Sequence, residues 1–469
     1  MARAFDAMLA GACTFGVAHV LRQQTFYKGD GHVYLQSILE GNLQHPHHLV
    51  YKPLVLGVHR LSAPLGASLY DAGVLASALG TAVGIACAVL ASRILGLTRG
   101  GAFAVAGLML SVPALLFFAT VVELHGVFLA FAGPALVAFA HLARAPGVRR
   151  GLVFGASLAL AYVGHASAAL LPALLLPLAL YYPAGPATPA ARLRALIAPT
   201  AAAGAVFALF LAVLPALGAW TGLGADTSSA AAYVVRDADT YARDARRWVT
   251  TLAYEWLLPY APLGLVALAA CFVGPCRGQA RWLCAAVVPY YLVCVFLLPS
   301  PEFGAYLTPF AWPLALLARR VLPRAGLATA ACAGLALGLA AIAWHDRPGA
   351  ARDFAASVRA AAGGRAPFLL LGDHDELKAK LIALPDVPHL LLLHAGTVPQ
   401  AMLDDALDRL EELLRAQQTE GRAVLLSDGA VRVLEQVAPS GPLVLPALRA
   451  RFAVERAGGG FAGFELRAR

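Results

Sequence analysis

The stretches Gly29-Asp30-Gly31-His32-Val33-Tyr34 and His45-Pro46-His47-His48-Leu49-Val50-Tyr51 lie between a long apolar run at residues 5–21 and another at residues 67–92. The 469-residue chain is 59% hydrophobic and only 13% charged, so its ionisable side chains are placed sparingly. An apolar helix of about 20 residues is long enough to cross the hydrocarbon core of a bilayer. The pattern therefore predicts a polar site held at a membrane surface by the helices on either side.

Further apolar runs continue outward from this site to residue 344. They lack the alternation of a membrane β-barrel, and a backbone in lipid must satisfy its own hydrogen bonds, so we expect α-helices. No small-residue cleavage site follows the first run, which is therefore interpreted as a retained helix and not as a signal peptide. We predict about eleven spans, near residues 5–21, 67–92, 101–121, 124–143, 151–164, 166–182, 197–219, 249–272, 282–299, 304–318 and 325–344.

The charged residues between the runs predict an orientation. If the N-terminus is cytoplasmic, the arginines of the membrane part gather at the cytoplasmic ends of the spans, as the positive-inside rule requires. The net charge of +9 is then a topology signal, and no nucleic-acid partner is predicted. All acids of the membrane part except Asp6 fall at or near the opposite side: Asp30, Glu40, Asp71, Glu123, Asp226, Asp237, Asp239, Asp244, Glu255 and Glu302.

The composition changes at Trp344-His345-Asp346-Arg347-Pro348-Gly349, where charge becomes dense. We expect a transmembrane domain at residues 1–344 and a soluble domain at residues 345–469, outside the cytoplasm because the number of spans is odd. The soluble part alternates short apolar runs with amphipathic helical patterns, which predicts a small α/β layer with a parallel sheet. The strands are expected at Phe368–Leu371, His389–His394 and Ala423–Ser427, and the helices near residues 374–383, 400–417 and 428–437.

The loop Gly372-Asp373-His374-Asp375-Glu376 follows the first of these strands and has two interpretations. It is an acidic metal or ligand loop at the end of a strand, or a turn in which Asp373 caps a helix and the next acids favour its positive end. We favour the capping turn. No Gly-rich phosphate motif accompanies the loop, so no nucleotide site is predicted. The seven cysteines avoid the first outer loop and the soluble part, which argues against a disulfide framework.

Asp30 and Glu123 are the candidates for chemistry. Asp30 lies just beyond the first span between two glycines, and a carboxylate at a low-dielectric interface is suited to act as a general base or metal ligand. A solvated loop aspartate is an equally good interpretation. Glu123 lies in the turn Thr120-Val121-Val122-Glu123-Leu124-His125-Gly126 between two spans, where an ionisable group more favourably faces a cavity than lipid. His125 is its partner or an interfacial histidine.

Other polar residues surround these two acids in the outer segments. Helical spacing at Tyr34–Leu39 and Leu54–Leu61 within residues 22–66 predicts amphipathic interfacial helices. His45, His47 and His48 do not have a recognised zinc spacing and Pro46 predicts a turn, so a metal site is not predicted. A second group of basic residues is suited to bind phosphate, or alternatively pairs with Asp237, Asp239 and Asp244. That group consists of Arg236, Arg243, Arg246 and Arg247, together with Lys28, Lys52 and Arg60.

A family resemblance emerges from the first 130 residues. A first span that ends in Gly29-Asp30, an interfacial segment with His45-Pro46 and Tyr51, and the acid of Val122-Glu123-Leu124-His125 together resemble the C-superfamily (GT-C) of membrane glycosyltransferases. The nearest branch resembles the bacterial membrane proteins related to protein O-mannosyltransferases. Mannosyltransferases of this kind usually carry two adjacent acids in the first loop, whereas Gly31 follows Asp30 here.

The resemblance implies a GT-C-like polytopic protein of a bacterial inner membrane, acting as a hexosyltransferase. It would transfer a sugar from a polyprenyl-phosphate donor to a protein, glycan or lipid acceptor outside the cytoplasm, with Asp30 as the base and Glu123 as a second, orienting carboxylate. No cofactor is implied with certainty, and a divalent cation is left open. Residues expected to bind donor or acceptor are Lys28, His47, His48, Tyr51, Lys52, His125, Arg243, Arg246, Arg247, Glu302 and Tyr306.

Two other functions fit the same composition. A transporter or lipid flippase also uses carboxylates for ion coupling, but here the acids gather at one face and no repeated half-helices are evident. A non-catalytic membrane assembly protein would use the outer domain to bind a partner, and it would tolerate the loss of Asp30.

Overall fold

The computed structural model describes residues 2–27, 30–43, 49–182, 189–221, 244–297, 302–392, 403–436 and 441–468. The chain divides into two compact units. The first comprises Met1–Gln23, Tyr27–Ala67 and Asp71–His345, and the second comprises Asp346–Arg469 with the short segments Gln24–Phe26 and Ser68–Tyr70.

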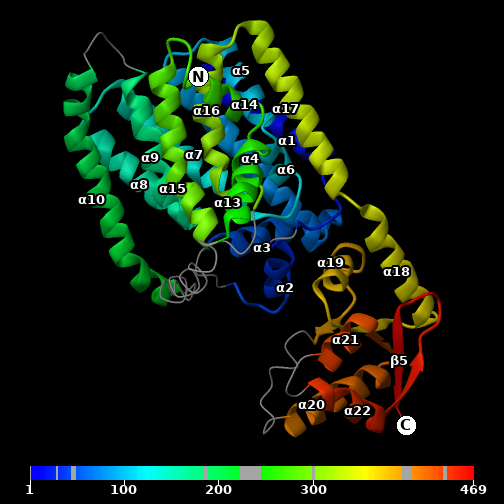
Figure 1. Cartoon of the computed structure of the whole chain (residues 1–469). Coiled ribbons are helices and arrows are strands. Elements are labelled where there is room, and N and C mark those ends of the chain that lie inside the picture. Colours follow the sequence, from blue (N-terminus) through cyan, green and yellow to red (C-terminus); the bar gives the residue numbers. More distant parts are fainter. Residues whose placement is uncertain are drawn as a thin grey trace. The chain divides into compact units, whose positions relative to one another are not determined.

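The first unit is a helical bundle (Figure 1). Its helices pack around a large apolar core, in which Trp312, Phe128 and Phe139 are fully buried. Its elements in chain order are α1 (Ala2–Val20), α2 (Gly31–Leu39), α3 (Tyr51–Ser62), η1 (Ala63–Leu65), α4 (Leu69–Ile94), α5 (Arg99–Leu110), α6 (Pro113–Ala119), α7 (Leu124–Arg144), α8 (Val148–Gly164), η2 (Ala166–Leu170), α9 (Leu171–Leu175), η3 (Leu176–Leu180), α10 (Pro189–Thr221), α13 (Ala245–Leu252), η4 (Ala253–Leu257), α14 (Leu263–Ala270), α15 (Arg277–Leu297), η5 (Ala305–Phe310), α16 (Ala311–Val321) and α17 (Arg324–His345).

Five helices in the described part of the chain are long and apolar enough to cross a membrane. A sixth span results if α5 and α6, which are bent by 75° relative to each other, are counted as one. Pro113 at the start of α6 has no amide hydrogen, which explains the break. The fold is therefore that of a polytopic membrane protein, while the count of eleven spans stays a prediction. The five are Leu69–Ile94, Leu124–Arg144, Ala190–Gly218, Arg277–Phe296 and Arg324–Ala362.

Two predicted spans are interrupted. Residues 249–272 do not form one helix but α13, the π-helical turn η4 and α14, because Pro259 and Pro262 cannot donate the backbone hydrogen bonds of a continuous helix. Residues 166–182 likewise form η2, α9 and η3, with Pro172 and Pro177 in the segment. The two amphipathic helices expected in the first loop are confirmed as α2 and α3.

Charged side chains are segregated along the first unit. Asp6, the acid that does not follow the orientation rule, is only 3% exposed, and its carboxylate contacts Arg99 Nε at 2.8 Å and Arg93 Nε at 3.6 Å. At the other end of α4, Asp71 pairs with Arg22 at 3.7 Å. The exception is thus a buried carboxylate neutralised by the arginines that flank it. All seven cysteines lie in the described residues and are free.

The second unit contains a five-stranded sheet in the order β2-β1-β3-β5-β4. The expected parallel strands are present, since β1 pairs in parallel with both β2 and β3. The predicted parallel sheet accounts for these three strands only, because β4 and β5 pair antiparallel with each other and β5 pairs antiparallel with β3. The elements are α18 (Pro348–Ala362), β1 (Pro367–Leu371), α19 (His374–Ala383), β2 (His389–Leu391), α20 (Leu403–Thr419), β3 (Ala423–Ser427), α21 (Asp428–Gln436), α22 (Gly441–Arg451), β4 (Phe452–Arg456) and β5 (Gly463–Ala468).

The acidic loop after β1 is a capping turn, as favoured above. The Asp373 carboxylate accepts a hydrogen bond from the Glu376 amide at 2.8 Å and so caps α19. The Glu376 carboxylate in turn accepts from Gly372 N at 3.1 Å, Gly429 N at 3.0 Å and Ser427 Oγ at 2.6 Å. Glu376 therefore joins the carboxyl ends of β1 and β3.

Candidate active site around Glu123

Glu123 is placed by an unusually close contact between α4 and α7. A Cβ added to Gly126 would meet Ser77 O at 2.3 Å, and one added to Gly80 would meet Gly126 O at 2.5 Å. Small residues let two membrane helices approach backbone to backbone in this way. At the same contact Ser77 Oγ donates to Glu123 O at 2.7 Å, so the start of α7 is fixed against α4.

The Glu123 carboxylate is buried, with 2% of the residue exposed. Its Oε2 accepts from Leu124 N at 3.2 Å and lies 3.9 Å from His125 Nε2, whereas Oε1 has no hydrogen-bond partner among the described residues. Burial raises the pKa of Glu123, the charges of Glu302 and Asp30 raise it further, and the amides of Leu124 and Gly31 lower it less. The neutral carboxyl form is therefore favoured, and one of its oxygens is available to a ligand.

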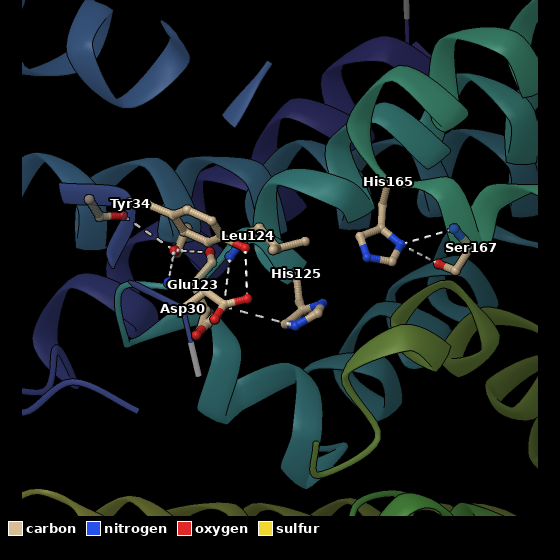
Figure 2. A network of polar contacts seen from close by, with 9 residues as sticks. Asp30, Tyr34, Glu123, Leu124, His125, His165 and Ser167 are labelled. Carbon is tan, nitrogen blue, oxygen red and sulfur yellow. Dashed lines mark hydrogen bonds and ion pairs between the residues drawn. The ribbon is translucent and has the colours of Figure 1, made fainter. Parts of the chain in front are cut away.

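Asp30 lies beside this carboxyl group at the start of α2. Asp30 is exposed, and its Oδ2 accepts a hydrogen bond from Tyr34 Oη at 3.2 Å, one helical turn later. The Tyr34 ring packs against Tyr51 with 5.1 Å between centroids. Figure 2 shows Asp30, Tyr34 and Glu123 together, with His125 next to Glu123. Two acids from distant parts of the sequence thus share one site.

Position 31 requires a glycine for a steric reason. A Cβ at this position would meet Val122 O at 2.3 Å, because the first residue of α2 packs directly on the strand-like residues before α7. A second acid at position 31, directly after Asp30, therefore has no room here. The second carboxyl group near Asp30 is that of Glu123.

Aromatic and imidazole rings line the far side of Glu123. The His125 ring lies 5.4 Å from Tyr306 and 6.0 Å from His165, measured between centroids. His165 Nδ1 lies 2.6 Å from Ser167 Oγ and accepts from Ser167 N at 3.0 Å, which fixes the ring at the end of α8 (Figure 2). The Phe118 ring, 4.8 Å from His125, closes the polar group on another side.

An apolar pocket of about 480 Å³ adjoins this group. Phe117 belongs to its wall and packs edge-on against Phe118, so pocket and polar group share one layer of rings. Trp344, 77% exposed, also lines it, which places the pocket at the edge of the bundle. The lining residues are Tyr27, Phe117, Tyr254, Phe303, Ala341, Trp344 and His345.

The remaining predicted site residues have varied surroundings. Tyr51 is buried beside Tyr34, and Lys52 is buried with Nζ donating to Asn42 O at 3.3 Å. Arg247 donates through Nε to Val295 O at 2.7 Å, near the end of α15, whereas Arg246 is exposed. Glu302 is half-buried and its charge acts on Glu123. Outside the described residues lie Lys28, His45, His47, His48, Arg236 and Arg243.

The sequence analysis did not predict Tyr34 and His165 as parts of the site. Tyr34 follows Asp30 by four residues at the start of a predicted helix, a spacing that brings two side chains together. His165 gave no comparable signal. Where the structure describes the chain, no group of three or more His, Cys, Asp or Glu side chains is arranged to hold a metal ion.

Comparisons with known proteins identify the fold. No protein-family model and no curated protein matches the sequence. The structure of ArnT from Cupriavidus metallidurans bound to undecaprenyl phosphate matches with a TM-score of 0.57 and 12% identity, over 98% of this chain and 97% of that chain. ArnT in the apo state matches with a TM-score of 0.53 and 12% identity over the same shares. The chain thus has the fold of ArnT, a GT-C glycosyltransferase, and the resemblance noted from the sequence is confirmed for the fold.

Proposed function

We propose that this chain, which has the fold of ArnT, transfers a sugar from a polyprenyl-phosphate donor to an acceptor hydroxyl outside the cytoplasm of a bacterium. The observation that carries the proposal is the arrangement around Glu123. A buried carboxyl group with one unpartnered oxygen lies beside the exposed Asp30, and the rings of Phe117 and Phe118 connect this polar group to an apolar pocket at the edge of a membrane bundle. Such a site combines polar groups for a reaction with an apolar surface for a lipid.

The proposed reaction is a direct displacement. The acceptor oxygen bonds to the anomeric carbon while the bond from that carbon to the phosphate oxygen breaks, and polyprenyl phosphate leaves with the bonding electrons. Asp30 accepts the proton of the acceptor hydroxyl, since it is exposed and held by Tyr34. Glu123 orients the acceptor or donor through its unpartnered Oε1. Lys28, Arg243 and Arg246 are proposed to neutralise the departing phosphate.

The pocket is proposed to hold the first part of the polyprenyl chain. Its volume of about 480 Å³ lies within the range of roughly 300–1,000 Å³ that is usual for small-molecule sites. Trp344 and Tyr254, which are 77% and 50% exposed, border its outer side, so a lipid chain can enter from the membrane. The undecaprenyl phosphate bound to ArnT is a lipid of this kind.

The same proposal assigns a location and an orientation. The protein is placed in the bacterial inner membrane with a cytoplasmic N-terminus, and residues 345–469 form a soluble domain on the outer side. The segregation of charge supports this orientation, because Asp6, Arg93 and Arg99 meet at one end of the bundle, away from Asp71 at the start of α4.

The test is transfer of a labelled sugar from a polyprenyl-phosphate donor by the purified protein in lipid nanodiscs. Replacing Asp30 with Asn should lower transfer by about 100-fold or more, the usual contribution of a general base. The control is Glu40→Gln, which removes an exposed carboxylate of the same outer segment that accepts a hydrogen bond from Gln36 Nε2 at 2.7 Å. Full transfer by Asp30→Asn would exclude the base assignment, and no transfer from any lipid-linked sugar would favour a transporter or an assembly protein.

A further inference from the structure

The short segment from Glu302 to Tyr306 has a backbone that its sequence does not favour. Phe303 has a φ of 54° and Gly304 a φ of 70°, so two successive residues are in the left-handed region. A bulky residue such as Phe rarely occupies this region, because its Cβ crowds the backbone. Contacts from elsewhere in the chain must therefore stabilise the conformation.

Glu255 supplies the main contact. Its side chain is buried, with 2% of the residue exposed, and both carboxylate oxygens accept backbone hydrogen bonds. Oε1 accepts from Glu302 N and Oε2 accepts from Gly304 N at 2.9 Å. A buried carboxylate is unfavourable unless its oxygens are bonded in this way, so the amides of the segment and the acid stabilise each other.

A second contact holds the segment from the same side. Tyr260 Oη donates to Gly304 O at 2.7 Å. A Cβ at Gly304 would meet Tyr260 Cε2 at 2.6 Å and Pro259 Cβ at 2.8 Å, so only glycine fits. The π-helical turn η4 contains Glu255 and ends just before Pro259 and Tyr260. Turns of this type frequently occur at functional sites. Glu255, Tyr260 and Gly304 together form a clamp on the segment.

The clamped segment presents three side chains to the site described above. The charge of Glu302 acts on Glu123, and the Phe303 ring lines the apolar pocket and packs on Phe117 at 5.5 Å. The Tyr306 ring lies 5.4 Å from His125. One buried carboxylate, itself outside the polar group around Glu123, therefore binds the backbone of a segment that reaches both the polar and the apolar parts of the site.

We propose that Glu255 is a positioning residue, which fixes residues 302–306 so that Tyr306 packs beside His125 and Phe303 forms a wall of the lipid pocket. This inference rests on the proposed glycosyl transfer. It differs from a purely structural role, because a structural role predicts loss of stability alone, whereas positioning predicts loss of transfer in protein that is still folded.

The test uses Glu255→Gln in the full-length protein, with two measurements. Hydrogen exchange followed by mass spectrometry reports the Glu302 and Gly304 amides directly, because they are the donors to Glu255. In peptides covering residues 302–310, exchange should become about tenfold faster or more, since an amide group cannot accept both bonds. Sugar transfer should fall about tenfold in kcat/KM, the loss expected for one charged hydrogen bond.

Asp6→Asn is the matched control. It also removes a buried carboxylate from the first unit, but at the contact with Arg93 and Arg99. It should lower the unfolding temperature at least as much as Glu255→Gln, yet leave exchange at residues 302–310 and transfer by folded protein unchanged. Gly304→Ala breaks the clamp from the other side, and combined with Glu255→Gln it should add little further loss. If Glu255→Gln fails to fold, Tyr260→Phe removes only the bond to Gly304 O and provides the same comparison.

The outcomes separate this inference from the proposed function. Unchanged exchange at residues 302–310 in Glu255→Gln would overturn it, and so would faster exchange with full transfer. If the wild type transfers no lipid-linked sugar, the proposed function fails and positioning for transfer fails with it. Loss of transfer in Asp30→Asn but not in Glu255→Gln would leave the proposed function intact and remove only the positioning role.

Discussion

Glu123 in the membrane unit and Glu376 in the sheet unit show two uses of an acidic side chain. Glu376 lies between the carboxyl ends of β1 and β3, where the strand order reverses and α/β sheets commonly bind ligands. Its two oxygens accept three hydrogen bonds from the chain itself, which fills that position. Glu123 is more deeply buried but keeps Oε1 without a partner in the described residues. A saturated carboxylate supports the fold, whereas an unsaturated one is suited to bind something else.

Removing the Glu123 side chain is the most direct test of the difference between these two acids. Glu123→Ala should lower sugar transfer by about 100-fold, the lower range for a group that acts in acid–base or orienting roles. Glu123→Gln should lose no more than about tenfold, because burial keeps the carboxyl group neutral and an amide resembles that form. Transfer by each variant in nanodiscs, corrected for the folded fraction, measures the difference. Equal losses in the two variants would show that the charged form acts.

Glu376→Gln is the corresponding substitution in the sheet unit. It leaves the site around Glu123 intact, so transfer by folded protein should stay at the wild-type level. The free energy of unfolding of the sheet unit should fall by about 1–3 kcal/mol, because an amide cannot accept all three hydrogen bonds. Hydrogen exchange in β1 and β3 of the full-length protein checks this. If Glu376→Gln lost transfer while β1 and β3 kept their protection, the distinction between the two acids would be wrong.

Gly31 and Gly57 offer a smaller comparison within the outer segment. Gly31→Ala should lower stability by about 1–3 kcal/mol through overpacking and reduce transfer, since the added Cβ meets Val122 O and moves Asp30 away from Glu123. Gly57 lies in α3 with nothing within 4 Å of an added Cβ, so Gly57→Ala should be neutral or stabilising by up to about 1 kcal/mol. Thermal unfolding and transfer assays on both variants measure these effects on stability and activity. A tolerated Gly31→Ala would contradict the close packing of α2 on α7.

The sequence predicts the regular parts of both units and fails where tertiary contacts decide. The helix at residues 374–383 and the strand Ala423–Ser427 have the predicted bounds, because local periodicity and capping are sufficient there. The strands β4 and β5 were not predicted, although Phe464 and Leu466 alternate with polar residues in β5. Prolines break the predicted span at residues 249–272, which a hydropathy average over that range does not reveal.

The site was predictable to the same limited degree. The one-sided distribution of acids predicted that Asp30, Glu123 and Glu302 lie on the same side, and the charges of Asp30 and Glu302 both act on Glu123. The contact of Glu255 with residues 302–304 could not be predicted, because its partners are backbone amides of a loop whose conformation depends on packing. The need for Gly31 was equally hidden, since Val122 is distant in sequence.

The smallest expected effect is an opposite pH dependence of the two units. Burial, with a smaller contribution from the charge of Lys380, lowers the pKa of His389 from its ordinary 6.5 to about 4. Between these values the unfolded chain binds a proton that the folded chain does not, so the sheet unit should gain stability as pH rises from 4 to 6.5. The raised pKa of Glu123 has the opposite sign, because the folded chain keeps a proton that the unfolded chain loses above pH 4.5. The membrane unit should therefore lose stability as pH rises.

The dependence of stability on pH can be measured for both units in the same protein. All six tryptophans lie before residue 345, so their fluorescence reports the membrane unit, while exchange in β1 and β3, corrected for its intrinsic pH dependence, reports the sheet unit. His389→Gln should flatten only the second slope and Glu123→Gln only the first, since each variant removes one titrating group. Parallel slopes in the wild type would mean that other groups outweigh these two. A slope unchanged by its own variant would refute the assigned residue, and with it the view that Glu123 is neutral where the proposed lipid-linked sugar binds.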